Sequence, residues 1–381
     1  MKRQTVIGFD AKRIVSNATG LGSYGRTLVN DLAAMGEWRM RLYAPTAGRD
    51  DLRSQVVVRD NVSFAYPVGC KTGLQRSFWR SRGIVADLKR DGVSLYHGLS
   101  GELPVGISKS GISSVVTIHD LIFLRHPEYY NWIDTKIYAW KFRRACQEAD
   151  RIIAISECTK RDIMELGGVA ADRIVLIYQS CAPRFSADVS DEERARVANA
   201  YQLPKRYLLS VGSIEQRKNI LLAVNALKSL PDDIHLVAVG KRTQYAENVL
   251  AQAIHGQLSH RVHFLHGVPD GDLPAIYAQA EVFVYPSRYE GFGIPVIEAI
   301  HCRLPVIACT GSCLEEAGGP DCLYVSPDDP EALAAAFLKL QQGAAGREER
   351  INRSRDYVRR FEGNDVARQV GEVYADCLLK K

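Results

Sequence analysis

Two glutamates are the first candidates for chemistry. In the stretch PSRYEGFGIPVIEA, Glu290 and Glu298 flank a segment that is rich in glycine and contains Pro295. Paired carboxylates can act as acid and base, hold a metal, or accept hydrogen bonds from hydroxyl groups. Because proline suits the first turn of a helix, the pattern predicts Glu290 in a loop and Glu298 in that first turn. This placement favours two binding groups for a hydroxyl-rich ligand.

A pair of adjacent cations is the second candidate. Gly212 and Ser213 leave an apolar strand in SVGSIEQRKNI, and Arg217 and Lys218 come just before a helical pattern. Two cations at a helix N-terminus are unfavourable unless an anion joins them. Arg217 and Lys218 are therefore candidates for binding a diphosphate, and a solvated charge pair is the alternative. The P-loop pattern GxxxxGK[ST] is absent from the sequence.

The segment GLGSYG, residues 20–25, matches the GxGxxG pattern of dinucleotide-binding proteins. Its context argues against NAD, because the first strand ends near Asp10 and the next strand lacks a closing acidic residue. We expect a mobile loop that caps a helix beginning near Ser23, with backbone N–H groups available to an anion. A flexible loop without a ligand is the alternative.

Histidine supplies the last candidate. His119 and Asp120 end the predicted strand SSVVTIHD, where an α/β enzyme presents functional side chains, although His119 alone could equally be a core histidine. His263 and His266 in SHRVHFLHG would point to opposite faces of a strand, so a metal site there is disfavoured. Asp272 in PDGDL is explained better as a helix N-cap than as a metal ligand.

Short apolar strands alternate with helical patterns and must position these residues. This alternation predicts an α/β protein with two Rossmann-like, doubly wound domains, each built on a parallel sheet covered on both faces. A polar segment over Pro183–Lys205 interrupts this alternation of strands and helices, so we expect one domain over 1–185 and a second over 186–360. The last segment, 361–381, is expected to be a helix that crosses back to the first domain. The predicted strands cover 4–10, 40–44, 93–98, 113–120, 151–156 and 173–178, then 206–212, 234–240, 261–267, 282–287, 305–309 and 322–327.

The charge of the chain is uneven. The net charge is +5, and residues 1–150 contain 22 basic and 14 acidic residues, which leaves −3 for the remainder. A basic N-terminal half suggests an anionic partner such as a phosphate or a lipid surface, whereas the excess is too small to favour nucleic acid. The nine cysteines form no CxxC pair and indicate a cytoplasmic protein. No apolar run is long enough to span a membrane, and the N-terminal apolar run contains a charge, unlike a signal peptide.

Together these motifs resemble the retaining glycosyltransferases of family 4. The resemblance rests on EGFGIPVIE, VGSIEQRKN, TIHDLIFLRHPE, ISECTKRDI and GLGSYG in this order, and it covers nearly the whole chain. It implies the GT-B architecture, in which two Rossmann-like domains face a central cleft. The bacterial mannosyltransferase-like group is the most similar, which implies synthesis of surface polysaccharide or lipopolysaccharide.

The resemblance also implies roles for individual residues. His119 and Glu290 would act on the donor sugar as catalytic residues, and Glu298 would hold the donor ribose. Arg217 and Lys218 would neutralise the diphosphate, the more so because Ser213 stands where many relatives have arginine. The other implied donor-binding positions are Gly22, Gly212, Gly291, Phe292, Gly293 and Ile294. The first domain would bind the acceptor and the second the nucleotide sugar.

The expected function is therefore transfer of a hexose, mannose favoured, from a GDP-sugar or UDP-sugar to a saccharide or lipid-linked saccharide. No cofactor and no metal are expected. The alternatives are a non-catalytic sugar-nucleotide-binding protein and a storage-glucan synthase, although GLGSYG lacks the lysine-glycine loop of starch-type synthases. Basic residues interleave with Phe78 and Trp79 over Cys70–Arg90, which suits peripheral contact with the cytoplasmic membrane face, and an ordinary solvated helix is the alternative.

Overall fold

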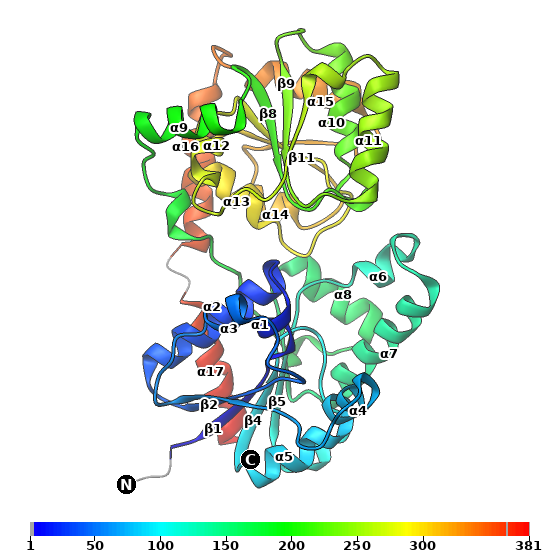
Figure 1. The fold of residues 1–381 in the computed structure, drawn as a ribbon, viewed down its shortest axis with the longest axis vertical. Coiled ribbons are helices and arrows are strands. Elements are labelled where there is room, and N and C mark those ends of the chain that lie inside the picture. The colour runs from blue at the N-terminus through cyan, green and yellow to red at the C-terminus, as the bar shows by residue number, and fades with distance from the viewer. Residues whose placement is uncertain (1–3, 363–364, 381) are drawn as a thin grey trace. The chain divides into compact units, whose positions relative to one another are not determined.

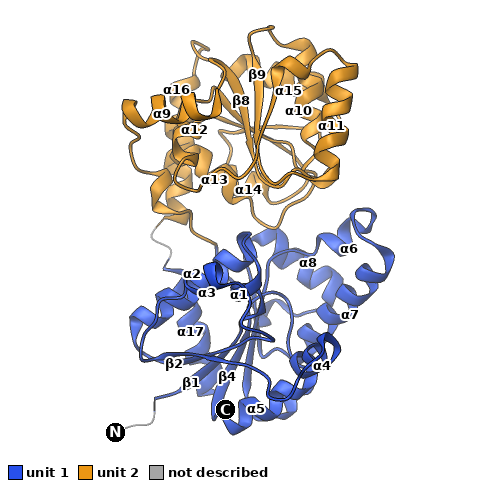
Figure 2. Ribbon diagram, viewed as in Figure 1, with its two compact units in different colours: residues 1–178, 364–381 blue, residues 179–363 orange. Residues whose placement is uncertain are grey.

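The chain folds into two compact units, seen in a computed structural model that describes residues 4–362 and 365–380 (Figures 1 and 2). Unit 1 comprises residues 1–178 and 364–381, and unit 2 comprises residues 179–363. Each unit is built on a single parallel sheet with helices on both faces. The predicted fold class, two Rossmann-like doubly wound domains, is confirmed.

Unit 1 contains a seven-stranded sheet in the order β3-β2-β1-β4-β5-β6-β7. The sheet has a hydrophobic core on each face. Successive residues of the strand Ser113–Ile118 show this, because Val115 packs in one core and Val116 in the other. Both faces are therefore buried, which explains why these strands are continuously apolar. The strands are β1 (Val6–Asp10), β2 (Arg39–Tyr43), β3 (Val62–Ala65), β4 (Val93–Gly98), β5 (Ser113–Ile118), β6 (Arg151–Ala154) and β7 (Ile174–Leu176).

The helices of unit 1 connect these strands and cover the two faces. They are α1 (Lys12–Ser16), α2 (Gly20–Met35), α3 (Asp50–Arg53), α4 (Gly73–Phe78), the π-helix η1 (Trp79–Gly83), α5 (Ile84–Arg90), α6 (Ile122–Arg125), α7 (Trp132–Glu148), α8 (Glu157–Gly167) and α17 (Val366–Leu379). The edge strand β3 was not predicted, because only one of its four residues is fully buried and its sequence lacks a clear apolar pattern.

Unit 2 contains a six-stranded sheet in the order β10-β9-β8-β11-β12-β13. All of its strand pairs are parallel. Its strands are β8 (Tyr207–Val211), β9 (His235–Val239), β10 (Val262–Leu265), β11 (Val282–Tyr285), β12 (Val306–Cys309) and β13 (Leu323–Val325). Its helices are α9 (Asp191–Tyr201), the 3₁₀ helix η6 (Gln216–Lys218), α10 (Ile220–Ala226), α11 (Gln244–His255), α12 (Leu273–Gln279), α13 (Ile294–His301), α14 (Leu314–Gly318), α15 (Pro330–Leu340) and α16 (Arg347–Val358).

The division between the units lies at residues 178 and 179, upstream of the expected boundary at 185 and 186. The polar segment 183–205 belongs to unit 2, because Phe185 packs edge-on against Tyr277 and α9 contacts α12. The final helix, α17, belongs to unit 1, where the hydroxyl of Tyr374 lies 2.6 Å from Nδ1 of the buried His97. Residues 363, 364 and 381 of the expected segment 361–381 lie outside the described residues.

The segment GLGSYG is helical, so the expectation of a mobile loop there is wrong. Helix α2 begins at Gly20, three residues before the predicted start at Ser23, and contains all three glycines. A β-carbon on Gly22 would lie 1.8 Å from the carbonyl oxygen of Asn17, and one on Gly25 would lie 2.9 Å from Ile14. Gly22 and Gly25 therefore allow α2 to pack closely against the segment before it.

We predict that Gly22→Ala destabilises the protein by roughly 1–3 kcal/mol, because the added methyl group must displace backbone. Gly20→Ala is the matched control on the same helix, since its methyl group would meet nothing within 4 Å. Alanine is also the better helix former, so Gly20→Ala should leave the melting temperature equal or raise it. Equal melting temperatures for the two variants would contradict this account of the glycines.

Candidate active site

The carboxylate of Glu290 is the centre of a charged cluster in unit 2. Its Oε1 atom lies 2.5 Å from Nζ of Lys218 and 3.0 Å from a guanidinium nitrogen of Arg217. The hydroxyl of Ser287 also donates to this oxygen, and Lys218 donates to the hydroxyl of Tyr285 at 2.7 Å. The cations follow β8 and the carboxylate follows β11. Because β8 and β11 are adjacent and parallel, these loops lie at the same carboxyl edge of the sheet.

The charges of this cluster balance one another inside the protein. Glu290 is only 8% exposed, and such burial alone would raise the pKa of its carboxyl group. The charges of Lys218 and Arg217 outweigh burial and hold that pKa below its ordinary value. Glu290 is therefore ionised at neutral pH. The anion that the adjacent cations were expected to require is thus present in the chain itself.

The backbone around the cluster is shaped by glycines. Gly212 follows β8 with φ of +148°, a conformation that favours glycine, and Ser213 comes directly after it. A β-carbon on Gly240 would lie 1.9 Å from the carbonyl oxygen of Gly212. The N–H group of Arg288 donates to the carbonyl of Arg217 at 3.0 Å and joins the two loops. The sequence places Gly212, Ser213, Arg217 and Lys218 on one loop, and the structure brings that loop to Glu290.

The segment between the two glutamates leads into helix α13. Gly293 has φ of +109° at the N-cap, and a β-carbon there would lie 2.8 Å from Leu314. The ring of Phe292 is buried edge-on against Phe361, so the side chain of Phe292 serves the core of unit 2. Gly291 and Ile294 are partly buried on either side. Phe292 can thus offer a ligand only its backbone.

Glu298 lies one residue further along α13 than expected. The helix begins at Ile294, so Glu298 is beyond the first turn and the prediction of a first-turn carboxylate is wrong. Its Oε2 atom accepts a hydrogen bond from the hydroxyl of Tyr277 at 3.0 Å. Burial raises the pKa of Glu298 to about 7, although this hydrogen bond and the charge of Arg184 oppose the rise.

Tyr285 lies near both carboxylates. Burial raises the pKa of its hydroxyl well above the ordinary value, and the negative charges of Glu290 and Glu298 both add to the rise. The positive charge of Arg217 opposes it. The hydroxyl of Tyr285, at the end of β11, is therefore close enough to feel the charge of both carboxylates, although one is on a loop and the other on a helix.

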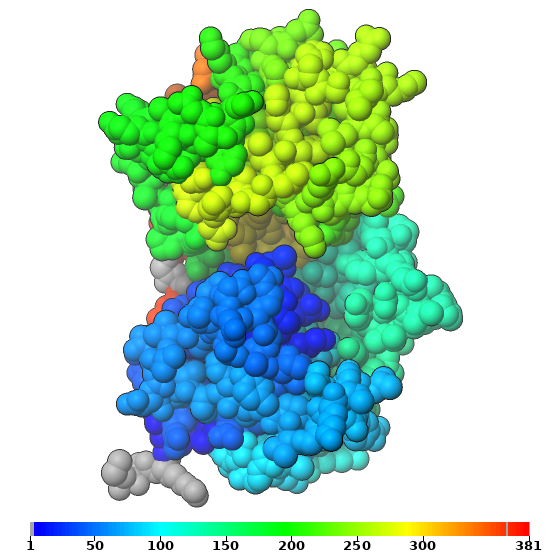
Figure 3. All heavy atoms as spheres, in the orientation of Figure 1, coloured from blue at the N-terminus to red at the C-terminus, as the bar shows by residue number. Residues whose placement is uncertain are grey.

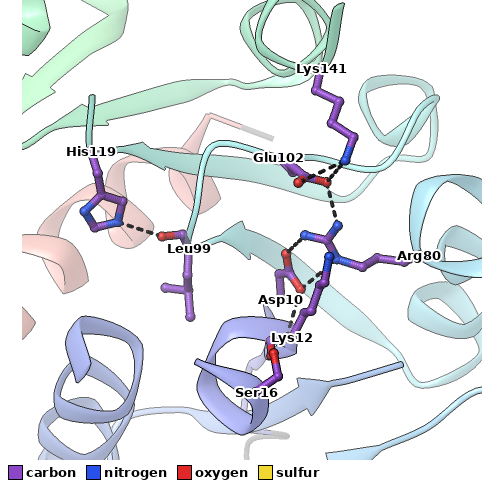
Figure 4. Close-up of polar contacts among 8 residues, drawn as sticks. All are labelled: Asp10, Lys12, Ser16, Arg80, Leu99, Glu102, His119 and Lys141. Carbon is purple, nitrogen blue, oxygen red and sulfur yellow. Dashed lines mark hydrogen bonds and ion pairs between the residues drawn. The ribbon is translucent and has the colours of Figure 1, made fainter. Parts of the chain in front are cut away.

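In unit 1, His119 is held as a neutral ring. Its Nε2 atom lies 2.9 Å from the carbonyl oxygen of Leu99, so Nε2 carries the proton and donates it (Figure 4). Tyr24 packs edge-on against the imidazole, with ring centroids 4.8 Å apart. Burial lowers the pKa of His119 to about 4, even though the bond to Leu99 opposes the change. At neutral pH the ring can form hydrogen bonds but carries no charge.

A buried ion-pair network lies beside His119 (Figure 4). Arg80 forms ion pairs with Asp10 and with Glu102, and Nζ of Lys141 lies 3.2 Å from Glu102. Burial would raise the pKa of Asp10 and of Glu102, but Arg80 holds both below their ordinary values, with help from Lys141 at Glu102. The network joins the ends of β1 and β4 to η1 and α7.

This network changes the interpretation of the segment Cys70–Arg90. Arg80, expected to contribute to a basic surface, is 13% exposed and lies inside the network. Trp79 is 7% exposed, and its ring N–H donates to Asp87 at 2.7 Å. Trp79 is therefore unavailable to a membrane, and that part of the expectation is wrong. Phe78 remains 65% exposed.

A cavity of about 290 Å³ lies in unit 1 at the carboxyl edge of its sheet. His119 and Asp120 line it together with Glu102 and Lys141 of the network. Aromatic side chains from α6, α7 and the segment before α7 complete the wall, namely Phe123, Tyr138 and Tyr130. Gly22, which is on α2, is buried against Asn17 in the preceding segment. It is not among the residues that line this cavity.

The sequence did not reveal several residues of these sites. Ser287 and Tyr285 were visible only as the end of a strand, and the network of Asp10, Arg80 and Glu102 joins residues far apart in the chain. One feature of the sequence could have pointed to them, namely their place at the carboxyl ends of strands. Asp10, Tyr285 and His119 all end or directly follow strands of parallel sheets.

The residues for which the sequence disfavoured a metal site make other contacts. Among residues 4–362 and 365–380, no three histidine, cysteine or acidic side chains are grouped to hold a metal ion. His263 lies 2.9 Å from His235, nitrogen to nitrogen. Asp272 occupies the N-cap position of α12, but its side chain does not cap the helix and instead pairs with Arg196 and Tyr201.

Comparison with known proteins agrees with this architecture. The model of Glycosyltransferase Family 4 matches residues 18–180, and the model of Glycosyl transferases group 1 matches residues 191–357. O-antigen chain mannosyltransferase B of Escherichia coli is 31% identical over 286 residues, which cover 74% of this chain and 74% of that protein.

Solved structures share the fold. Sucrose-phosphate synthase from Thermosynechococcus elongatus has a TM-score of 0.79 at 21% identity, covering 99% of this chain and 100% of that one. Anabaena HepE, solved in complex with UDP and glucose, has a TM-score of 0.75 at 16% identity, covering 98% of this chain and 100% of that one. The two doubly wound units thus have the GT-B fold. The chain belongs to the glycosyltransferases of family 4.

The raised pKa of Glu298 predicts a stability that depends on pH. Since burial favours the protonated form, the stabilisation is complete below pH 4.5 and is lost as pH rises through about 7, by about 3 kcal/mol in total. Glu298→Gln should remove this loss, so the melting temperature of the variant should rise relative to wild type between pH 5 and pH 8.

Glu348→Gln, at an exposed carboxylate of α16, is the matched control and should track wild type. A constant difference between Glu298→Gln and wild type across this range would contradict the buried, protonated form of Glu298.

Proposed function

We propose that this glycosyltransferase moves a hexose, mannose favoured, from a nucleotide diphosphate sugar to a saccharide or lipid-linked saccharide, with retention of configuration. The observation that carries the proposal is the ionised Glu290 beside Lys218 and Arg217 at the carboxyl edge of the sheet of unit 2. The resemblance to an O-antigen chain mannosyltransferase supports mannose and a role in lipopolysaccharide or surface polysaccharide synthesis.

Unit 2 would bind the donor. Lys218 and Arg217 are the cations for its diphosphate, and Glu298 would accept hydrogen bonds from the ribose. HepE, which shares the fold, is described with UDP and glucose, which supports a GDP-sugar or UDP-sugar here. Backbone groups of the two loops and of the start of α13 would approach the donor at Gly212, Ser213, Gly291, Phe292, Gly293 and Ile294.

The mechanism follows from competition for the cations. A diphosphate brought to Lys218 and Arg217 would take over part of their pairing with Glu290. The carboxylate would then turn its acceptor capacity to the hydroxyls of the sugar. The cations stabilise the charge that develops on the leaving diphosphate, so no metal is required. The transition state has oxocarbenium character, and the leaving phosphate deprotonates the acceptor on the same face of the sugar.

Unit 1 would bind the acceptor and contribute His119. Because this ring is neutral at pH 7, we assign it hydrogen bonding to a sugar hydroxyl and exclude it as a charged acid. The cavity beside it combines aromatic rings with carboxylates, which suits the apolar faces and the hydroxyls of a saccharide. Gly22 would act indirectly, by fixing the start of α2. We propose a cytoplasmic location because of the cysteine pattern.

The test is transfer with retention of configuration. A thermal-shift panel of GDP-, UDP- and ADP-sugars first identifies the donor, because a bound ligand raises the melting temperature. With an α-linked donor, NMR of the product should show an α linkage. Hydrolysis and transfer assays also separate an enzyme from a non-catalytic binding protein.

Glu290→Ala should lower turnover by roughly a hundredfold or more, as expected when a group that stabilises the transition state is lost. Glu362→Ala, a loop substitution in the same unit, is the control. A β-linked product, or full activity of Glu290→Ala, would contradict the proposal.

A further inference from the structure

Helix α7 of unit 1 exposes an unusual number of large apolar side chains. Trp132 is 72% exposed, Ile133 57%, Trp140 51% and Ile137 44%. The opposite face of the same helix is buried through Ala139, Phe142, Ala145 and Cys146. In Figures 1 and 3, the turquoise segment from α6 to α7 forms an outer flank of unit 1. The exposed apolar residues of α7 therefore do not contribute to the core of unit 1.

The exposed residues form one stripe. Ile133, Ile137 and Trp140 are spaced by four and three residues and so lie along the same side of the helix, with Trp132 at its N-terminal end. Single exposed apolar residues are normal in proteins, but a contiguous apolar patch marks an interaction surface. The stripe on α7 meets that description.

The charge of the stripe indicates what covers it. Lys136 and Arg143 lie among the apolar residues and are exposed. Arg144 borders them, and its pairing partner Glu148 is buried and held by Ser108. Tryptophan and isoleucine flanked by lysine and arginine are the composition of a helix that lies in the interface of an anionic membrane. None of the described helices is long and apolar enough to cross a membrane.

The side of α7 that carries Tyr138 and Lys141 reaches the cavity of unit 1. Tyr138 and Lys141 line that cavity with His119, and Lys141 joins the network through Glu102. A single helix therefore carries both the exposed stripe and part of the cavity wall. A saccharide attached to a membrane lipid would be brought beside His119 if α7 rested on that membrane.

We propose that the stripe Trp132, Ile133, Lys136, Ile137, Trp140 and Arg143 is a docking surface for an anionic lipid membrane. It replaces the segment Cys70–Arg90 as the main contact, since Trp79 and Arg80 are turned inward. Docking places the acceptor cavity at the lipid surface, but lipid binding itself does not require that the proposed sugar transfer be correct.

Tryptophan fluorescence reports on this surface directly. The chain has four tryptophans; Trp38 and Trp79 are buried, and both exposed ones, Trp132 and Trp140, are on α7. With the full-length protein and no nucleotide, vesicles of phosphatidylethanolamine and phosphatidylglycerol should bind the protein in sedimentation. Brominated lipids in those vesicles should quench its fluorescence. Vesicles of phosphatidylcholine alone should bind at least tenfold more weakly, because they lack the negative charge.

Two variants separate the apolar and the charged contributions. Trp132→Ser with Trp140→Ser, and Lys136→Glu with Arg143→Glu, should each weaken vesicle binding by roughly tenfold or more. Trp132→Phe with Trp140→Phe should largely restore binding. Melting temperatures should stay near wild type, because the changed side chains are exposed.

The matched control lies in unit 2, where Ile254 on α11 is 64% exposed and Leu338 on α15 is 45% exposed. Ile254→Ser with Leu338→Ser should bind vesicles like wild type. Equal binding by wild type and both α7 variants would overturn the proposal. It would also be overturned by a dimer that the tryptophan variants dissociate in the absence of vesicle binding. Absence of sugar transfer would contradict only the proposed function.

Discussion

The burial of one ionised carboxylate, Glu290, determines how the candidate donor site of unit 2 is built. A buried charge without a partner is strongly destabilising, so the carboxylate must be matched. Lys218 and Arg217 supply the match from the loop after β8, while Glu290 comes from the loop after β11. The parallel pairing of β8 with β11 brings the two loops to one edge of the sheet. The order of the strands in the sheet therefore makes this electrostatic contact possible.

The same contact makes the site suited to exchanging one anion for another at Lys218 and Arg217. The two cations are satisfied before any ligand arrives, so the loops do not need a ligand to be electrostatically balanced. A diphosphate offers more negative charge than one carboxylate, and it would compete for the same cations. Glu298 differs, because burial raises the pKa of its carboxyl group to about 7 and it has no cation within hydrogen-bonding distance among its described contacts. The two glutamates are thus chemically unlike, although the sequence makes them look like a pair.

Much of the fold could be predicted from sequence, because continuous apolar strands alternate with helices in both units. The positions of His119, Glu290 and Lys218 followed from the rule that ligands bind beyond the carboxyl ends of parallel strands. Contacts between distant loops could not be predicted, since Lys218 and Glu290 are 72 residues apart. The glycines of GLGSYG looked like a loop because glycine usually breaks helices, whereas here Gly22 and Gly25 allow close packing of α2. Trp79 looked like a surface residue, but its ring N–H is paired with Asp87.

Calorimetric titration of GDP and UDP tests the account most directly, because a nucleoside diphosphate brings the diphosphate to the cations without the sugar that Glu290 would bind. For whichever nucleotide binds, Lys218→Met should raise the Kd by roughly tenfold to a hundredfold, the effect of losing a charge-assisted hydrogen bond. Glu290→Gln should leave the Kd equal or lower it, because the carboxylate that competes with the diphosphate is gone. An unchanged Kd in a folded Lys218→Met variant, or equal weakening in both variants, would contradict the claim that the diphosphate takes over the cations of Glu290.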